Sequence, residues 1–490
     1  MRKFIVLSFC LAGLPFAQSL DPQHPTWWAK YQFLSHNGAE PGAPSASLSV
    51  GANVDVSNEC GPQSETFITV NPSRPSVLAA GSNEIFRDPM RGYFSTDGGA
   101  SWGAVDLPLP PPKSANATLF GSDPTLAFDS SGNVFYGYIV VFFGNGNGVN
   151  GSEIAVARST DGGQTYPQAT YFAFETGSNH FNDKPMIAAD TNVGSPFRDR
   201  VYIAWDAAVG GSSAGGVRLA WSADHGMTFN NIRVDNPHGP GKAIGAVPFI
   251  GPGGEVYVAW NDYAANAIIV NRSLDGGITW ATPVQVAAKQ LAFDIAIPAE
   301  SDRGALVYPA CDADRSSGPH RGRIYCAWMD LTPAGTTDIF AAYSDDRGAT
   351  WSDKAAVTDR LPSLSVDRFN HWLSTDPVTG DVNISFYDTR SDTTGFRYMT
   401  DIFLTRSADG VTWSSPNIRV STQSSNEHDC NGVFPCTGIN YGNQQGDYAG
   451  LVAYGGTAHP IWTDSRNQLQ TSTGCRTNLV MEEVFTAAVK

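Results

Sequence analysis

The sequence predicts an all-β protein built from repeated four-stranded units. Three observations support this: a short motif recurs along the 490 residues, each copy follows a short apolar run, and two further apolar runs precede it. Short runs rich in Val, Ile, Tyr and Phe, separated by Gly and Asp, are typical of β-strands. The regular recurrence predicts one architecture repeated along the chain, although this length could also hold two or three average domains.

The recurring motif, called the box below, has the form Ser-x-Asp-x-Gly-x-Ser/Thr-aromatic. Six segments carry it, the last one residue shorter: "STDGGASW" (95–102), "STDGGQTY" (159–166), "SADHGMTF" (222–229), "SLDGGITW" (273–280), "SDDRGATW" (344–351) and "SADGVTW" (407–413). Gly tolerates a positive φ and an Asp carboxylate accepts hydrogen bonds from backbone amides, so each box predicts the turn of a β-hairpin. Because a catalytic site would not need six equivalent aspartates, we expect Asp275 and its counterparts to have a structural role.

Four strands in each unit of about 60 residues match the period of a propeller blade. The third unit, for example, has "KPMIAAD" and "RVYIAW" before the strand that leads to its box. The C-terminal stretch supplies three strands without a box, and "ANVDVS" (52–57) can supply the fourth. We therefore predict a β-propeller of seven four-stranded blades over residues 46–490, closed by this N-terminal strand. Six blades with an irregular end piece is the alternative.

The first residues have the pattern of an export signal. Arg2 and Lys3 precede the apolar run "FIVLSFCLAGLPFA", and small residues are spaced for cleavage near residue 19. The run is too short to span a bilayer. We expect residues 1–19 to be a signal peptide, residues 20–45 to form an N-terminal segment, and the mature protein to be secreted or periplasmic.

The mature chain is strongly acidic. Loss of Arg2 and Lys3 lowers the 31 basic residues to 29 against 47 acidic ones, a formal charge of −18. Such a surface repels nucleic acid and anionic membranes, so we expect neither nucleic acid nor membrane insertion. We also expect a monomer.

Six cysteines remain after the predicted cleavage, and an even number in an exported chain favours disulfides. No pair has Cys-x-x-Cys spacing, which argues against a zinc or thioredoxin-like site. The segment "CNGVFPC" makes Cys430 with Cys436 the easiest pair to propose. The other pairings stay open among Cys60, Cys311, Cys326 and Cys475.

The boxes resemble the Asp-box, or BNR, repeat of the sialidase-like superfamily over about residues 46–490. This resemblance implies a propeller and points to exo-sialidases, although the repeat also occurs in lyases and in non-catalytic propellers. Family sialidases usually have six blades and carry Phe/Tyr-Arg-Ile-Pro in the first strand of the first blade. The corresponding strand here, "ETFITVNP", has no arginine, and the nearest similar segment is "FRDP" with Arg87.

The resemblance also implies that ligands bind around the central channel, on the face opposite the boxes. If the boxes join third and fourth strands, that face collects the starts of first strands and the ends of second strands. The starts supply Glu65, Asp123, Asp183, Lys184, Asn370, His371, Asp447 and Tyr448. The ends supply Asp206, Asp262, Asp330, Asp388, Arg390, Asp464 and Arg466.

Glycoside hydrolysis generally needs two carboxyl groups across a sugar, and the resemblance implies a tyrosine nucleophile assisted by a carboxylate. We expect Tyr448 to be this nucleophile, with Asp447 and Glu65 as its acidic partners. The other catalytic candidates are Asp123, Asp183 and His371. The candidates for substrate binding are Arg390, Arg466, Lys184 and Arg87 for a carboxylate, Asp388 and Asp464 beside the arginines, and Trp372 for stacking on a sugar ring.

Structural roles are the alternative for several of these residues. Asp206, Asp262 and Asp330 can cap strand ends, and His371 can be a packed, hydrogen-bonded histidine. Asp388 with Arg390, and Asp464 with Arg466, can be salt bridges held in place.

We predict an exported glycoside hydrolase, similar to exo-sialidases, that releases a terminal acidic sugar from glycans. A non-catalytic propeller that binds glycans or proteins is the alternative, and a polysaccharide lyase that uses His371 is a further one. We expect no required cofactor, although several aspartates near one axis could hold Ca²⁺.

Overall fold

The computed structural model describes residues 48–490, with gaps at 58, 60–61, 85–86, 114–117, 144–148, 177–180, 208–215, 236–241, 362–363, 429–444 and 467–481. The chain divides into two units, Met1–Ser49 and Val50–Lys490, and every described strand belongs to the second. The predicted signal peptide and residues 20–45 lie outside the described residues, as do four cysteines: Cys60, Cys430, Cys436 and Cys475.

All strands of the described residues pair in antiparallel ladders, and no helix occurs among them, hence none that could cross a membrane. In three sheets the strands follow one another in chain order. The first contains β2 (Gln63–Val70), β3 (Leu78–Glu84), β4 (Arg91–Ser95) and β5 (Gly103–Asp106). The second contains β6 (Thr118–Phe128), β7 (Val134–Phe143), β8 (Val149–Ser159) and β9 (Gln168–Thr176). The third contains β10 (Asn182–Ala189), β11 (Val201–Ala207), β12 (Gly216–Ser222) and β13 (Asn230–Arg233).

Three further sheets repeat this order. The fourth contains β14 (Ala243–Ile250), β15 (Val256–Asp262), β16 (Ala267–Ser273) and β17 (Val284–Ala288). The fifth contains β20 (Pro309–Ala313), β21 (Ile324–Leu331), β22 (Thr337–Ser344) and β23 (Ala355–Ala356). The sixth contains β24 (Arg368–Thr375), β25 (Val382–Asp388), β26 (Met399–Ser407) and β27 (Ile418–Arg419), with β28 (Ser425–Asn426) also paired to β26. A separate hairpin of β18 (Asp294–Ile297) and β19 (Glu300–Leu306) precedes the fifth sheet.

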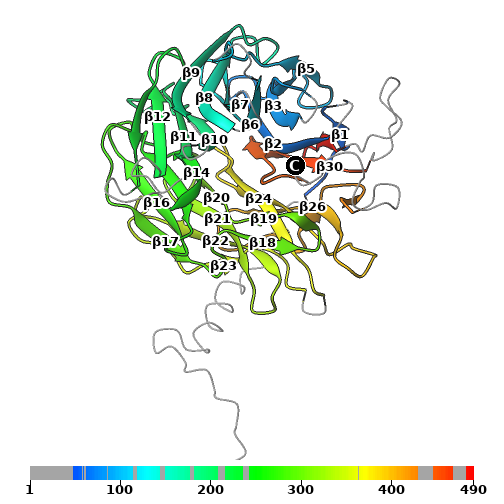
Figure 1. Cartoon of the computed structure of the whole chain (residues 1–490). Coiled ribbons are helices and arrows are strands. Elements are labelled where there is room, and N and C mark those ends of the chain that lie inside the picture. Colours follow the sequence, from blue (N-terminus) through cyan, green and yellow to red (C-terminus); the bar gives the residue numbers. More distant parts are fainter. Residues whose placement is uncertain are drawn as a thin grey trace, which may run out of the picture. The chain divides into compact units, whose positions relative to one another are not determined.

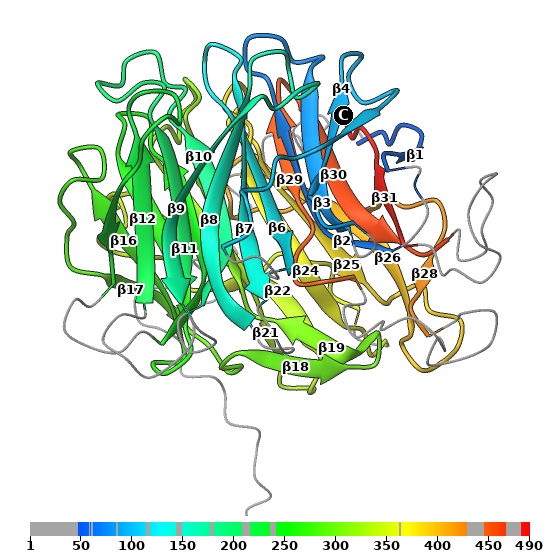
Figure 2. The same ribbon diagram turned by 45° about the horizontal axis from the view of Figure 1, so that its top comes forward.

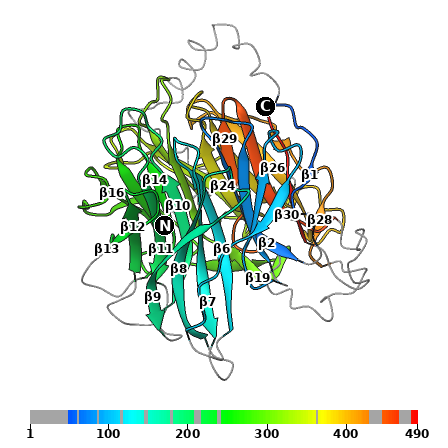
Figure 3. The same cartoon turned by 90° about the horizontal axis from the view of Figure 1, so that it is seen from above.

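The seventh sheet joins strands from the two ends of the second unit. It contains β29 (Leu451–Tyr454), β30 (Thr457–Asp464), β31 (Glu483–Thr486) and β1 (Val54–Asp55). The outermost pairing places Val54 opposite Thr486, and an isolated bridge joins Val50 to Val489. Figure 3 shows β1 beside the end of the chain.

The first strands of the seven sheets contact one another in a closed cycle, from β2 through β6, β10, β14, β20, β24 and β29 back to β2. Figure 1 shows the sheets following one another around a common centre in chain order. In β2, β14 and β24 every side chain is buried, because each of these strands is covered by neighbours on both sides. The arrangement is consistent with a β-propeller, and the predicted all-β class with four-stranded antiparallel sheets is confirmed.

All six boxes lie between a third and a fourth strand of their sheet. In "SLDGGITW" Ser273 Oγ donates to Asp275 Oδ1 at 2.8 Å, and Thr279 donates to the same carboxylate through its amide at 2.8 Å and its hydroxyl at 2.6 Å. Gly277 adopts a φ of 93° and donates its amide to Ser273 Oγ at 2.9 Å. Burial alone would raise the pKa of Asp275, but the hydrogen bonds from Thr279 and Ser273 lower it to about 2. The carboxylate therefore holds the turn and is ionised at any ordinary pH.

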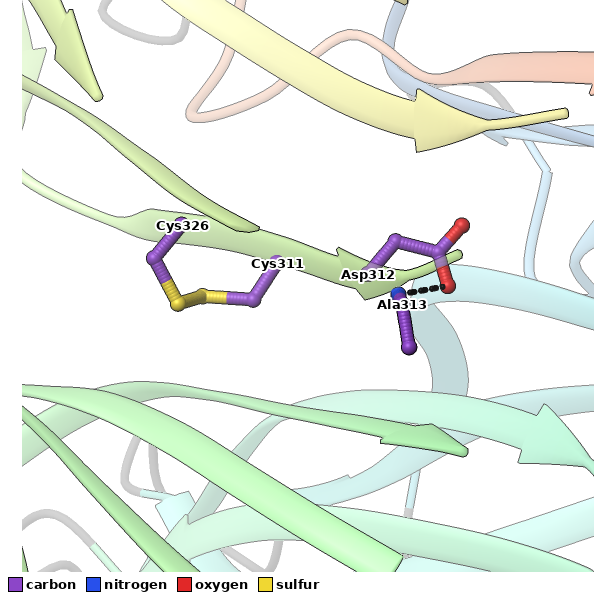
Figure 4. The surroundings of a disulfide bond; sticks show 4 residues. All are labelled: Cys311, Asp312, Ala313 and Cys326. Atoms are coloured by element: carbon purple, nitrogen blue, oxygen red, sulfur yellow. Dashed lines mark hydrogen bonds between the residues drawn. A yellow bond between two sulfur atoms is a disulfide. The ribbon is translucent and has the colours of Figure 1, made fainter. Parts of the chain in front are cut away.

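A disulfide joins the first two strands of the fifth sheet. Cys311 on β20 and Cys326 on β21 occupy directly opposed positions in the ladder (Figure 4). Beside it, the Asp312 carboxylate accepts hydrogen bonds from the amides of Ala313 at 2.8 Å and Thr375 at 2.9 Å. Because Thr375 belongs to β24, Asp312 ties the fifth sheet to the sixth.

Substitution of Asp275 should lower stability without altering the rest of the fold. Asp275→Ala removes the acceptor for Ser273 and Thr279, so we expect a loss of about 1 kcal/mol in the free energy of unfolding. Because the folded pKa lies below the ordinary value of 3.8, this contribution is present above pH 4 and is lost as pH falls through about 2.

Urea unfolding of the wild type and Asp275→Ala at pH 7 measures the difference. Asp275→Asn retains one acceptor oxygen and serves as the matched control, with a smaller loss expected. Equal stability of all three proteins would show that the carboxylate does not hold the turn.

Candidate functional site

Five first strands contain a β-bulge, where the register to the second strand shifts. One residue of each bulge has a left-handed φ: Glu65 (55°), Asp123 (62°), Lys184 (46°), Gly245 (71°) and Asn370 (44°). This conformation is unfavourable for residues other than glycine. Bulges redirect side chains and are frequent beside functional sites, where backbone strain is retained. We therefore expect a functional site at the starts of the first strands.

These bulges lie at the end of the sheets opposite the boxes. Each sheet is an antiparallel meander, so the start of its first strand and the end of its second strand share one end, while the turn between third and fourth strands lies at the other. This is the face on which the sequence analysis placed its candidates.

A pocket of about 490 Å³ opens at this end, beside the starts of the first and second sheets. Two of the bulge carboxyl groups, those of Glu65 and Asp123, line it. Its wall also includes Phe120 and two arginines, Arg87 and Arg303. Carboxyl groups, cations and an aromatic ring thus share one cavity.

Asn83 holds the two bulge carboxyl groups in place. Its amide nitrogen donates to Glu65 Oε2 at 2.8 Å, and its amide oxygen accepts from the backbone of Asp123 at 2.8 Å. Ser122 Oγ donates to Asp123 Oδ1 at 2.6 Å, and the backbone of Lys184 donates to Asp123 Oδ2 at 3.1 Å. The bulges of three neighbouring sheets are therefore linked by hydrogen bonds, which fixes the carboxyl groups relative to one another.

The ammonium group of Lys184 lies inside a cluster of acids and tyrosines. The side chain is 3% exposed, and Nζ lies 3.8 Å from the ring centroid of Tyr308 and 3.5 Å from that of Tyr448. Among the described residues Nζ has no hydrogen-bond partner, so cation–π contacts replace part of its hydration. Burial lowers the pKa of Lys184 to about 8, although the negative charges of Asp447 and Glu65 act to raise it.

Asp447 is held by an arginine from the β18–β19 hairpin. Arg303 donates through Nε to Oδ1 at 2.6 Å and through a terminal nitrogen to Oδ2 at 2.7 Å, a bidentate geometry. The hydroxyl of Tyr308 donates to the same Oδ2 at 3.2 Å. The Arg303 side chain keeps 36% of its surface exposed, so the ion pair borders the pocket.

Three carboxyl groups of the cluster bind protons more tightly than usual. Burial, followed by the charges of Asp447 and Asp123, raises the pKa of Glu65 well above 4.5. Burial, with the charges of Asp123 and Asp206, raises the pKa of Asp183 well above 3.8. Burial raises the pKa of Asp206 to about 8. At neutral pH the cluster therefore carries fewer negative charges than it has carboxyl groups.

Two glycines make room for this cluster. A Cβ on Gly245 would lie 2.4 Å from Cδ1 of Tyr308, and a Cβ on Gly446 would lie 2.5 Å from Cγ of Glu65. Both glycines have a left-handed φ, 71° and 78°. Any other residue at these positions would displace Tyr308 or Glu65 from the site.

Tyr448, Trp372 and His371 are among the predicted residues that do not line the pocket. Tyr448 belongs to the cluster, but it is 2% exposed and its hydroxyl donates to the carbonyl of Pro124 at 3.0 Å. Trp372 is 7% exposed, meets Phe67 edge to face at 5.1 Å, and lines a cavity of about 180 Å³ elsewhere between the first strands. His371 is buried, which lowers its pKa to about 4, and it packs against β21.

The two predicted Asp-x-Arg pairs are salt bridges within their own sheets. Arg390 pairs with Asp388 at 2.7 Å and also with Asp359, and its guanidinium lies over Phe403. Arg466 donates through Nε to Asp464 at 2.8 Å. Neither arginine lines the pocket.

Arg87 is the predicted arginine that does line the pocket. Its guanidinium pairs with Glu59 at 2.9 Å and lies 3.5 Å from Asp106. The side chain is 38% exposed. Arg87 therefore adds a positive charge at the outer part of the cavity, although it is not in a Phe/Tyr-Arg-Ile-Pro segment.

The three aspartates at the ends of second strands differ in role. Asp206 belongs to the cluster around Lys184. Asp262 accepts hydrogen bonds from two following backbone amides, at 3.0 and 2.8 Å, as a capping residue does. Asp330 accepts three backbone hydrogen bonds and pairs with Lys354 at 2.7 Å.

Tyr308, Arg303 and Asn83 belong to the site but were not predicted from the sequence. Tyr308 precedes the first strand of the fifth sheet, the position that supplies Glu65 and Asp123 in theirs, so its place carried a usable signal. Arg303 carried none, because the hairpin that presents it is not part of the repeat. No group of three or more His, Cys, Asp or Glu side chains suited to a metal ion occurs within the part of the chain that the structure describes.

No family model matches the chain, and no curated protein does. Solved structures with some similarity include the leech intramolecular trans-sialidase, with 13% identity and a TM-score of 0.45 over 69% of this chain and 67% of that one. The NanB sialidase of Streptococcus pneumoniae has 11% identity and a TM-score of 0.46 over 77% and 71%. A PL25 ulvan lyase has 12% identity and a TM-score of 0.37 over 70% and 77%. Similarities this low carry no argument about this chain.

Removal of the buried cation should change how Glu65 titrates. The charge of Lys184 opposes the rise in the pKa of Glu65, so we expect Lys184→Met to raise that pKa further. NMR titration of the glutamate side chains, with Glu65 assigned by substitution, measures the shift. Lys354→Met removes a cation from Asp330, outside the cluster, and should leave Glu65 unchanged. An unshifted Glu65 in Lys184→Met would contradict the electrostatic coupling.

Proposed function

We propose that the protein is a glycoside hydrolase and that the pocket lined by Glu65, Asp123 and Arg303 is its active site. The observation that carries the proposal is the pair of bulge carboxyl groups, fixed through Asn83, that face one cavity in strained backbone. Glycoside hydrolysis requires two such groups, one of which must hold a proton at the working pH. The box resemblance to the sialidase-like superfamily supports a glycan as the substrate.

Glu65 is the proton donor in this proposal. Burial and the surrounding charges keep its carboxyl group protonated at a pH where an ordinary glutamate is ionised. Asp123 is the second carboxyl group, held as an acceptor by Ser122 and by the backbone of Lys184. Tyr308, whose hydroxyl donates to Asp447, and Tyr448, the predicted nucleophile, both lie outside the lining of this pocket, and neither has a catalytic role in this proposal.

The substrate we propose is a terminal acidic sugar. Arg303 and Arg87 are the arginines that line the pocket, and they replace Arg390 and Arg466 as the groups that attract its carboxylate. Protonation of the carboxyl groups with raised pKa would reduce the repulsion that an anionic substrate meets. We further propose a seven-bladed propeller, supported by seven four-stranded sheets and their closed cycle of contacts, and an exported, monomeric protein without a required cofactor.

A non-catalytic glycan-binding propeller is the second candidate. It is favoured by the partners that these groups already have: the Tyr448 hydroxyl donates to a backbone carbonyl, and Arg87 and Arg303 each pair with an acid. Binding of glycans without product formation would support this candidate over the first.

Glu65→Gln should abolish most of the hydrolysis, because glutamine cannot donate the proton. We expect the rate to fall by about 10²–10⁴-fold on fluorogenic sialosides, with folding retained. Since Glu65 acts protonated and its pKa lies well above 4.5, wild-type activity should persist above pH 4.5 and decline as pH rises through the raised value.

Glu255→Gln changes a glutamate in the turn between β14 and β15 and is the matched control, with full activity expected. Absence of product from sialosides and from neutral glycosides between pH 4 and 8 would reject the hydrolase. Product from neutral glycosides alone would reject the acidic sugar but retain the class of enzyme.

A further inference from the structure

The hairpin of residues 294–306, called the strap below, lies outside the four-stranded sheets. Figure 2 shows β18 and β19 at the lower end of the sheets, and β19 contacts β24 of the sixth sheet. The returning strand carries Arg303 to Asp447, and the chain then continues to Tyr308. The hairpin therefore presents Arg303 to the pocket.

The tip of the strap is buried. Ile297 is 4% exposed and Ala299 and Glu300 are fully buried, whereas Asp294 and Ala296 earlier in the hairpin are exposed. Hairpin tips are usually the exposed part of such an element. This tip is therefore docked against the rest of the sheets.

A histidine and a tyrosine of the sixth sheet's outer segments hold the turn of the strap. His428 Nε2 lies 2.6 Å from the carbonyl oxygen of Pro298. The His428 ring stacks on Tyr398, with ring centroids 4.0 Å apart. Both residues belong to the segments that flank β26 and β28, so the tip of the strap reaches the sixth sheet.

Three glutamates meet beneath the tip: Glu300 of the strap, Glu427 after β28 and Glu482 before β31. They are 0%, 5% and 2% exposed, and we call them the glutamate trio. The carboxyl groups of Glu427 and Glu482 share a hydrogen bond, which requires a proton on one of them. Within the described residues, at least one oxygen of each carboxyl group has no hydrogen-bond partner.

The charges around the trio are mainly negative. Burial, with the charges of Glu427 and Asp447, raises the pKa of Glu300 well above 4.5, and the charge of Arg303 opposes this rise. Burial also raises the pKa of Glu427 and Glu482, with Asp464 acting on Glu427. Among the described residues, Tyr387 and His428 also lie close to the trio or the turn. Docking therefore depends on protons held by the trio.

We propose that the strap is a pH-sensitive element of the site. While the trio holds its protons, the tip stays docked and Arg303 reaches Asp447. When the trio ionises, repulsion and the return of the carboxylates to water release the tip, and Arg303 leaves the pocket with it.

The direction of this response follows from proton linkage. An undocked Glu300 has its ordinary pKa of 4.5, whereas the docked one has a higher pKa. The equilibrium constant for docking is therefore largest below pH 4.5. It falls as pH rises above this value, by up to about tenfold per pH unit for each carboxyl group that loses a proton. Release of Arg303 also leaves Asp447 unpaired beside the pocket.

Hydrogen exchange of residues 294–306 in the full chain tests the proposal without any substrate. We expect the protection of these amides, corrected for the intrinsic exchange rate, to fall at least tenfold between pH 5 and pH 8 in the wild type. Glu300→Gln keeps the size of the side chain without its charge, so its strap should remain protected at pH 8. Because this readout needs no activity, it can fail or succeed independently of the proposed hydrolase.

Asp294→Asn changes an exposed acid of the same strap and is the matched control, with the wild-type response expected. Glu300→Gln retains His428, so a response that persists in this variant would assign the switch to the histidine and overturn the proposal. Equal protection of the wild-type strap at pH 5 and pH 8 would also overturn it. Recovery of protection at pH 8 on addition of Ca²⁺ would identify a cation site in place of a proton switch.

Discussion

The site depends on one electrostatic constraint: several carboxyl groups are buried around a single lysine. Moving an isolated charge out of water costs several kcal/mol, so such a cluster persists only when its charges are paired or neutralised. The ammonium group of Lys184 lies against the ring of Tyr448. Arg303 forms an ion pair with Asp447, and Glu65 retains its proton. Each solution leaves a different chemical state in the cluster, namely a cation, an anion and an acid.

The path of the backbone by itself brings these groups close together. A closed cycle of first strands places their starts around one axis, and in five of these strands a bulge redirects a side chain. This arrangement requires a left-handed backbone conformation at Glu65, Asp123 and Lys184. The surrounding hydrogen bonds must offset the unfavourable energy of this conformation. The same geometry explains why the fourth sheet has Gly245 at its bulge, since Tyr308 occupies the space of a side chain there.

The repeat in the sequence was sufficient for the fold class and for the role of the boxes. Box spacing and the apolar runs depend on local structure, so the strands of each sheet and the turn around Asp275 could be predicted. The roles of single charged residues could not, because they depend on distant partners. Arg390 pairs with Asp359, and this partner precedes its sheet. Arg303 belongs to a hairpin outside the repeat, and its proximity to Asp447 crosses 144 residues of sequence.

The pairing of β1 with β31 has a consequence for how the ring can close during synthesis. Val54 is made about 430 residues before its partner Thr486, a delay of about 20–90 s at ordinary rates of translation. For that time the first sheet has no neighbour on one side, and its flank is open to other chains. The last strand to appear, β31, therefore completes the seventh sheet by joining β30 to β1.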